Sequence, residues 1–395
     1  MGQFRYAERT ECMESSILRE ILKVTAQPGM ISLAGGLPSP DAFPVELVKE
    51  LCDKALTTWK DSILQYGTSE GFAPLLEALS GYLKNDRHIE SAETDRILVT
   101  NGSQQILDVV AKLFIMPGDK IAVESPTYLG ALQAFNPYQP VYVDIATDEE
   151  GVIPESLEEV AVKEKPKFFY LVPTFQNPTG KSIGLERRKA IADIAIKHNL
   201  LIVEDDPYGA IRYRGEPLPP IASLASDNIL YSGTFSKTFA PGLRLGFVTA
   251  PKDLISWMVK AKQSIDLHTS TFVQALAALY LGEGHMKRQI PKICELYRPK
   301  QEAMLAALKK HFPSSFFFTE PEGGMFVWAE GPEGFDSLAV YEKAIERKVA
   351  YVPGRFFYTR KEDGAGTIRL NFTNSTVEQI NSAVATLGDL FAEQV

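Results

Sequence analysis

Four polar motifs in the sequence each follow directly on a short run of β-forming residues. They are TNGSQQ at 100–105, TFQNPTG at 174–180, EDDPY at 204–208 and SGTFSK at 232–237. In turn they offer free N–H groups at a helix start for an anion, a carboxamide, adjacent carboxylates and a lysine amine. Taken singly, each motif is also typical of a turn, a helix cap or a solvated lysine. The four together, in this order, predict one site that holds a small-molecule cofactor.

The acidic motif leaves open which carboxylate would face a ligand. Asp205 and Asp206 follow the apolar run LLIVE. Two adjacent carboxylates at the end of a buried strand are unusual without a cationic partner. Spacing alone does not choose between them. Arg244, seven residues after Lys237 in PGLRLG, adds a cation near the last motif.

Other motifs of known chemistry are absent or weak. No GxGxxG follows a β-forming run, which argues against a nicotinamide-binding enzyme. Gly180–Ser182 ends like a phosphate-binding P-loop, but Phe175 stands where the first glycine is required. The segment 67–71 (GTSEG) fits the GxSxG elbow of serine hydrolases with Ser69 as nucleophile, and SILQY before it could form the strand. Because this segment precedes all the β-forming runs, we favour a glycine-rich turn and keep the hydrolase as a distant alternative.

The four motifs need a scaffold that brings strand ends together. Seven β-forming runs alternate with helical stretches, at 96–100, 120–124, 141–145, 167–172, 200–204, 229–233 and 244–249. Continuous apolar strands separated by helices predict an α/β fold with a mostly parallel sheet between helices. In such sheets ligands bind at the carboxyl ends of the strands, where the four motifs lie.

The rest of the chain predicts a second, smaller α+β unit. Apolar residues have helical spacing at 14–26, about 45–58 and 72–84, and again from about 285 and from about 376. Between the last two stretches come the β-forming runs GGMFVW, VAYVPG and TIRLNFT. We expect a large ligand-binding domain at 46–285 and a small domain from 1–45 and 286–395.

Composition bounds the class of protein. The 395 residues carry 41 Lys and Arg against 50 Asp and Glu, a net charge of −9. This acidic balance argues against a protein that coats nucleic acid, and no apolar run approaches the about 18 residues that cross a bilayer. The N-terminus lacks a secretory apolar stretch, and Cys12, Cys52 and Cys294 form no CxxC pair. We expect a cytoplasmic protein with no nucleic-acid partner, no membrane partner and no metal.

With these motifs in place, the sequence resembles the fold-type I pyridoxal-phosphate (PLP) enzymes, and among them the class I/II aminotransferases. The likeness runs through essentially the whole chain and is greatest to the 2-aminoadipate/kynurenine aminotransferase branch. The matching segments, in the family's order, are ISLAGGLPSP, LQYGTSEG, TNGSQQ, FQNPTG, VEDDPY, GTFSK, PGLRLGF, AKQSIDLHT, GGMFVW and IRLNF. The resemblance implies a seven-stranded sheet in the large domain and an aminotransferase activity (EC 2.6.1.-).

The resemblance assigns the groups around the cofactor ring. Lys237 matches the lysine that forms a Schiff base with PLP and then moves a proton between substrate and cofactor. Asp205 matches the carboxylate that keeps the pyridine nitrogen protonated, so that the ring can accept electrons. Asn177 and Tyr208 match residues that hydrogen-bond the ring oxygen O3′, and Tyr128 matches the aromatic side chain that stacks on the ring.

The resemblance also implies how the phosphate is held. The implied phosphate ligands are Ser103 and Gln104 at a helix start, Thr234, Ser236 and Arg244. Thr234 stands where many relatives carry serine, and it retains the hydroxyl group. Tyr66 matches a tyrosine that reaches the phosphate from a neighbouring subunit, which implies a homodimer with shared active sites.

Substrate contacts are implied at Arg369, Asn177, Gly36 and Arg19. Arg369, which would otherwise be read as a surface charge, matches the arginine that grips the substrate α-carboxylate through a bidentate pair. Gly36 matches a small residue in the N-terminal loop near the substrate, and the resemblance implies that this N-terminal segment of the small domain covers the substrate. Arg19 matches a position where some relatives bind a distal acid group, but it is equally typical of a solvated helix face.

The implied reaction moves an amino group from an L-amino acid to a 2-oxo acid, with 2-oxoglutarate expected as acceptor and a ping-pong mechanism. If Arg19 binds substrate, 2-aminoadipate and glutamate are favoured as donors. Otherwise the site favours aromatic or aliphatic amino acids. Another PLP enzyme, such as a β-lyase, is the alternative.

Overall fold

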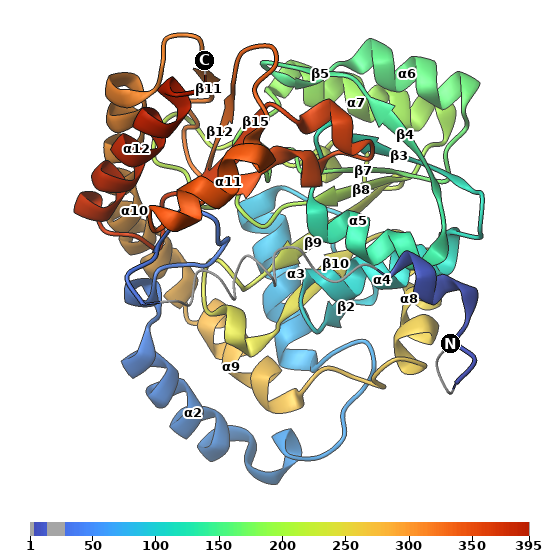
Figure 1. Ribbon diagram of the computed structural model, residues 1–395. Helices are drawn as coiled ribbons and strands as arrows, with labels where there is room; N and C mark the ends of the chain where they lie inside the picture. The colour runs from blue at the N-terminus through green and yellow to red at the C-terminus, as the bar shows by residue number, and fades with distance from the viewer. Residues whose placement is uncertain (1–3, 14–27, 395) are drawn as a thin grey trace.

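The computed structural model describes residues 4–13 and 28–394 of the chain (Figure 1). The predicted helix at 14–26, with Arg19, lies outside the described residues.

A seven-stranded sheet forms the centre of the molecule. Its order is β2-β10-β9-β8-β7-β3-β4. The strands are β2 (Ile97–Thr100), β3 (Lys120–Glu124), β4 (Val141–Ile145), β7 (Phe169–Leu171), β8 (Ile202–Asp205), β9 (Ile229–Thr234) and β10 (Gly246–Thr249). Only β10 runs antiparallel to its two neighbours in this sheet. The prediction of a mostly parallel sheet is confirmed, and each of the seven β-forming runs contributes one strand.

Helices cover both faces of this sheet because its strands are apolar on both sides. In β2, Ile97 and Val99 pack into one hydrophobic cluster and Leu98 into another. The first cluster includes α2 (Val45–Trp59), α3 (Ala73–Arg87), α6 (Pro154–Lys163), α7 (Leu185–His198) and α9 (Thr271–Gly282). The second includes α4 (Ser103–Phe114), α5 (Leu129–Phe135) and α8 (Lys252–Gln263). The sheet therefore holds its strand ends rigidly between two helical layers (Figure 1).

A four-stranded sheet with order β11-β12-β15-β14 lies in the C-terminal part. Its strands are β11 (Phe317–Phe318), β12 (Phe326–Glu330), β14 (Val352–Pro353) and β15 (Thr367–Asn371), and its helices are α10 (His285–His311), α11 (Ser337–Glu346) and α12 (Val377–Ala392). The early strand β1 (Ile31–Ser32) joins this part by pairing in parallel with β13 (Val349–Ala350). A short hairpin pairs β5 (Thr147–Asp148) with β6 (Gly151–Val152). The domain limits at 46–285, 1–45 and 286–395 stay a prediction.

The strand that the serine-hydrolase alternative requires before Ser69 is not formed. The chain there forms a 3-10 helix at Lys60–Ile63 and then a loop, so no strand leads into the GTSEG segment. Gly71 in this loop has φ +143°, and a Cβ at that position would lie 2.6 Å from Cγ2 of Val99. The glycine thus serves a close approach of the loop to β2. The turn interpretation explains the motif, and the geometry of a nucleophile elbow around Ser69 is missing.

We expect Gly71→Ala to lower the free energy of unfolding by about 1–3 kcal/mol, because the methyl group strains the backbone and meets Val99. Gly81, inside α3 with open space around its Cα, is the matched control. Gly81→Ala should raise stability by up to about 1 kcal/mol through helix propensity. Thermal denaturation of both variants measures the two changes, and equal effects would contradict the packing role of Gly71.

Candidate active site

One cavity of about 270 Å³ collects most of the predicted site residues. Twelve of them line it: Gly36, Ser103, Gln104, Tyr128, Asn177, Asp205, Tyr208, Thr234, Ser236, Lys237, Arg244 and Arg369. They come from the ends of β2, β3, β7, β8 and β9, as well as from the N-terminal loop and β15. The parallel strands of the sheet therefore deliver polar side chains to one place at their carboxyl ends.

Lys237 follows β9 and reaches into this cavity. Its Nζ donates a hydrogen bond to the backbone oxygen of Gly36 at 2.8 Å. Displacement from water, with the nearby cations Arg369 and Arg244, lowers the pKa of Lys237 to about 8. A lysine with a lowered pKa holds a larger fraction of free amine near neutral pH, which is the form that attacks a carbonyl carbon.

Asp205 ends β8 and is 2% exposed. Its carboxylate accepts hydrogen bonds from the hydroxyl groups of Tyr170 (3.0 Å to Oδ2) and Ser232 (3.1 Å to Oδ1). Burial outweighs these bonds and raises its pKa to about 6. Both partners are neutral, so the carboxylate is suited to a cationic ring nitrogen in the cavity. Asp206 does not line the cavity and is instead paired with Arg87.

Arg369 is 1% exposed on β15, which differs from the surface position that the strand pattern alone suggests. Its guanidinium donates to Oδ1 of Asn177 at 2.8 Å and to the backbone oxygen of Ala34 at 2.6 Å. Its Nε is buried without a partner among the described residues. Burial lowers the pKa of Arg369 to about 10. A buried guanidinium with only neutral acceptors favours a ligand carboxylate.

The start of α4 forms a concave anion site with Arg244. Gly102, not Ser103, is the N-cap, and its φ is +79°. A Cβ on Gly102 would lie 2.6 Å from Nη2 of Arg244, so the glycine lets the guanidinium approach the helix start. On the other side, the Thr234 hydroxyl donates to Oγ of Ser236 at 3.0 Å. Free helix N–H groups, two hydroxyls and a guanidinium fit a phosphate group.

A buried ion pair that the sequence did not reveal supports this helix start. The Lys262 side chain is 0% exposed, and its Nζ lies 2.8 Å from Oδ1 of Asp266. Asp266 also accepts from the side-chain amides of Asn101 and Gln105, which flank the helix start. The i, i+4 spacing of Lys262 and Asp266 is typical of exposed ion pairs on helices, so the sequence did not indicate that this pair supports the start of α4. Tyr170, a partner of Asp205, lies inside an apolar run and carried no sequence signal, and the bond from Ser232 of the SGTFSK motif to Asp205 could not be predicted from spacing.

Two predicted residues are not in the cavity. Tyr66 is 80% exposed and outside it, with its ring edge-on to His268 at a centroid distance of 5.8 Å. Arg19 lies outside the described residues. In residues 4–13 and 28–394 no group of three His, Cys, Asp or Glu side chains could hold a metal ion. No helix in the same residues is long and apolar enough to cross a membrane.

The sheet topology and the cavity at its strand ends are those of fold-type I PLP enzymes. The family model for aminotransferase class I and II matches residues 29–387, and the chain belongs to this family. It is a PLP-dependent aminotransferase, as the resemblance of its motifs predicts.

Three relatives illustrate the similarity. Aromatic-amino-acid aminotransferase 1 of Thermococcus litoralis is 43% identical, over 99% of this chain and 94% of the relative. The structure of Pyrococcus horikoshii kynurenine aminotransferase, in complex with PMP and kynurenine, is 41% identical with a TM-score of 0.95, covering 99% and 97% of the two chains. The structure of α-aminoadipate aminotransferase from Thermus thermophilus, complexed with N-(5′-phosphopyridoxyl)-L-leucine, is 35% identical with a TM-score of 0.90, covering 98% and 97%.

The lowered pKa of Lys237 predicts how cofactor capture depends on pH. Because the free amine reacts and the ammonium does not, the rate at which apoenzyme takes up PLP should rise with pH and reach half its maximum near pH 8. Stopped-flow absorbance measures this rate. In Arg369→Gln the midpoint should move upward, because one of the two nearby cations is gone. A rate that keeps climbing to about pH 10, the ordinary lysine value, would contradict this environment.

Proposed function

We propose that this aminotransferase moves the amino group of an L-amino acid to 2-oxoglutarate in two half-reactions of a ping-pong mechanism. The observation that carries the proposal is that one cavity holds two cationic side chains with no carboxylate bonded to either among the described residues. Lys237 and Arg369 contact only neutral oxygens among the described residues. One is suited to bond to the cofactor and move the substrate proton, and the other to hold the α-carboxylate.

PLP, when bound, supplies an electron sink for the bond that breaks at the substrate Cα. The chain's own groups support this chemistry from several sides. Lys237 acts as the base that removes and returns the Cα proton, and Asp205 holds a proton on the ring nitrogen by its negative charge. Asn177 and Tyr208 would hydrogen-bond the ring oxygen, and Tyr128 would contact the ring. The residues that would hold the phosphate are Ser103, Gln104, Thr234, Ser236 and Arg244.

Arg369 and the N-terminal loop orient the substrate. The guanidinium lies over the rings of Phe326 and Phe357, with distances of 4.4 and 5.0 Å from its Cζ to their centroids. These contacts help to hold the guanidinium in place for a bidentate pair with a carboxylate. Gly36 brings its backbone oxygen to Lys237 and lines the cavity beside the lysine, which supports a place for this loop next to the substrate.

We propose aromatic amino acids, kynurenine and 2-aminoadipate as the donor class. Support comes from the names of the three relatives, two of which act on aromatic or kynurenine substrates and one on α-aminoadipate. The cavity offers apolar contacts from Leu37 and Val172 for a ring or an alkyl chain. Arg19 remains our candidate for binding a distal acid group of the substrate, and the proposal of 2-aminoadipate as a donor depends on this contact.

A homodimer with shared active sites is part of the proposal. Tyr66 is 80% exposed and Leu64 is 70% exposed, and Leu267 is 49% exposed on the segment that carries His268, the ring neighbour of Tyr66. Exposed apolar side chains of this kind mark a surface that another protein covers. In a dimer Tyr66 would reach the phosphate of the partner subunit. We keep the cytoplasm as the compartment, since Cys12, Cys52 and Cys294 are free thiols.

We also propose a two-domain organisation. The seven-stranded sheet lies within 46–285, and so do nearly all residues of its two hydrophobic clusters. A separate hydrophobic cluster surrounds the four-stranded sheet. Separate cores support a large domain at 46–285 and a small one from 1–45 and 286–395.

Lys237→Ala should abolish both turnover and the visible absorbance of the purified enzyme, because no other amine lies in the cavity among the described residues. Absorbance spectra and a coupled assay for the 2-oxo acid product measure the two effects. Lys300→Met, which removes a buried lysine outside the cavity, is the control and should keep the absorbance. A yellow, active Lys237→Ala enzyme would refute the assignment.

Asp205→Asn should bind PLP but lower kcat by about 10²–10⁴-fold, because a neutral amide no longer holds a proton on the ring nitrogen. Single-turnover kinetics separate this loss from substrate binding. Near-normal rates would count against the role of Asp205.

A panel of donors with 2-oxoglutarate as acceptor tests the substrate class. We expect phenylalanine, kynurenine and 2-aminoadipate to exceed aspartate in kcat/KM, and Arg19→Ala to lower only the value for 2-aminoadipate. Formation of glutamate is the readout, and release of ammonia or sulfide without glutamate would identify a β-lyase. Equal losses for all donors in Arg19→Ala would contradict a specific contact with the distal acid.

A further inference from the structure

Three consecutive carboxylates end β8, and all three are buried. Glu204, Asp205 and Asp206 are 0%, 2% and 9% exposed. Side chains alternate along a strand, so Glu204 and Asp206 point away from Asp205. Glu204 accepts from the backbone N–H groups of Ile221 and Ala222, both at 2.8 Å. Among the residues that the structure describes, Asp206 is the one of the three with a cation bonded to it. A buried carboxylate is stabilised by a bonded cation, and the cation bonded to Asp206 is Arg87, which lies outside the cavity.

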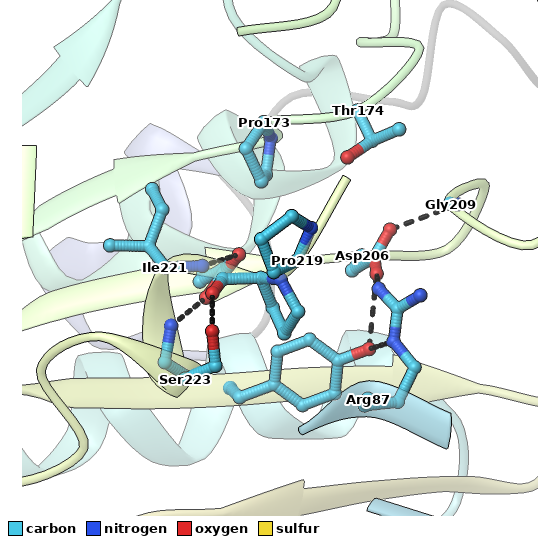
Figure 2. Close-up of polar contacts among 12 residues, drawn as sticks. Arg87, Pro173, Thr174, Asp206, Gly209, Pro219, Ile221 and Ser223 are labelled. Atoms are coloured by element: carbon cyan, nitrogen blue, oxygen red, sulfur yellow. Dashed lines mark hydrogen bonds and ion pairs between the residues drawn. The ribbon is translucent and has the colours of Figure 1, made fainter. Parts of the chain in front are cut away.

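Asp206 is held from three directions (Figure 2). Its Oδ2 accepts from Nη2 of Arg87 and from the hydroxyl of Tyr231 at 3.0 Å. Its Oδ1 accepts from the backbone N–H of Gly209 at 2.9 Å. Arg87 completes a triangle by donating from Nε to the Tyr231 hydroxyl at 3.2 Å. The carboxylate is therefore fixed in place and its charge is compensated.

The bond from Gly209 to Asp206 closes a turn that faces the cavity on its other side. Pro207 and Tyr208, the two residues inside the turn, both line the cavity with Asp205. A Cβ on Gly209 would collide with the Asp206 carboxylate, so the glycine is needed for the turn to close. Asp206 thus fixes the backbone between Asp205 and Tyr208, the two residues that we assign to the cofactor ring.

Arg87 anchors this turn from a distance. It is the last residue of α3, is 9% exposed and does not line the cavity. The other titratable groups facing Asp206 come from each element packed around it: Tyr82 of α3, Arg188 of α7, Glu204 and Asp205 of β8, and Tyr231 of β9. Arg188 donates its hydrogen bonds to the oxygens of Pro173, Thr174, Ile183 and Pro219. Arg87 is therefore the cation bonded to Asp206.

We propose that Arg87 is a positioning residue for the transamination reaction, acting through Asp206. It cancels the charge of Asp206, so that Asp205 is the one uncompensated carboxylate beside the cofactor ring. It also holds the turn that presents Tyr208. The inference rests on the proposed function, because it assigns a remote residue to the electrostatics of the same cofactor site.

The test compares Arg87→Met, Asp206→Asn and the double variant, each loaded with PLP. The readout is the pH midpoint at which the visible absorbance of the bound cofactor is lost. Arg87→Met leaves an extra negative charge near the ring, so the midpoint should rise by about 1 pH unit. Asp206→Asn leaves an extra positive charge and should lower the midpoint. The double variant removes both charges and should return close to the wild-type value, while asparagine keeps the acceptor for the Gly209 N–H.

If Arg87 had a purely structural role, the variants would lose stability, but the pH midpoint would not shift in opposite directions in the two single variants and return in the double variant. Identical midpoints in all variants and the wild type would overturn the proposal, as would shifts of the same sign. If Arg87→Met does not fold, the proposal is tested by Asp206→Asn, whose pH midpoint should fall. Tyr231→Phe keeps the ion pair and is the matched control. A wild-type protein without visible absorbance would instead overturn the proposed function, and this inference with it.

Discussion

The structure depends on charged groups that gather around one cavity and have no opposite charge bonded to them among the described residues. Lys237, Arg244 and Arg369 line one cavity with Asp205, and their hydrogen bonds within the described residues go to neutral groups. Such an arrangement is unfavourable until a ligand completes it. PLP would offer its phosphate to Arg244, its protonated ring nitrogen to Asp205 and its aldehyde to Lys237, and the substrate would offer its carboxylate to Arg369. Binding and activation of the cofactor therefore follow from the same electrostatic feature.

The fold supports this feature with rigid elements. The parallel strands end together, so short loops after β2, β7, β8 and β9 suffice to collect the charges. Two helical layers hold these ends, and β15 adds Arg369 from a second sheet. Supporting groups lie just behind the cavity. The Lys262–Asp266 pair fixes the helix start, and the Arg87–Asp206 pair fixes the turn before Tyr208.

Much of the fold could be predicted because its signal is local. Each central strand is a short apolar run, and the sequence shows all seven. The site was harder, because a side chain's role depends on partners far away in sequence. Spacing could not separate Asp205 from Asp206, since the distinction comes from Arg87, 119 positions earlier than Asp206. Arg369 and Lys262 resemble surface charges until the packing around them is known. The SILQY segment, which only the hydrolase alternative required as a strand, begins inside the 3-10 helix Lys60–Ile63, and its β-forming residues belong to none of the sheets in the described residues.

The central claim is that an uncompensated amine at position 237 bonds to PLP. Its most direct test is reduction of the PLP-loaded protein with borohydride, followed by proteolysis and mass spectrometry. The account predicts one phosphopyridoxyl group per chain, on the peptide that contains Lys237. A reduced cofactor on another lysine, or no modified peptide at all, would contradict it.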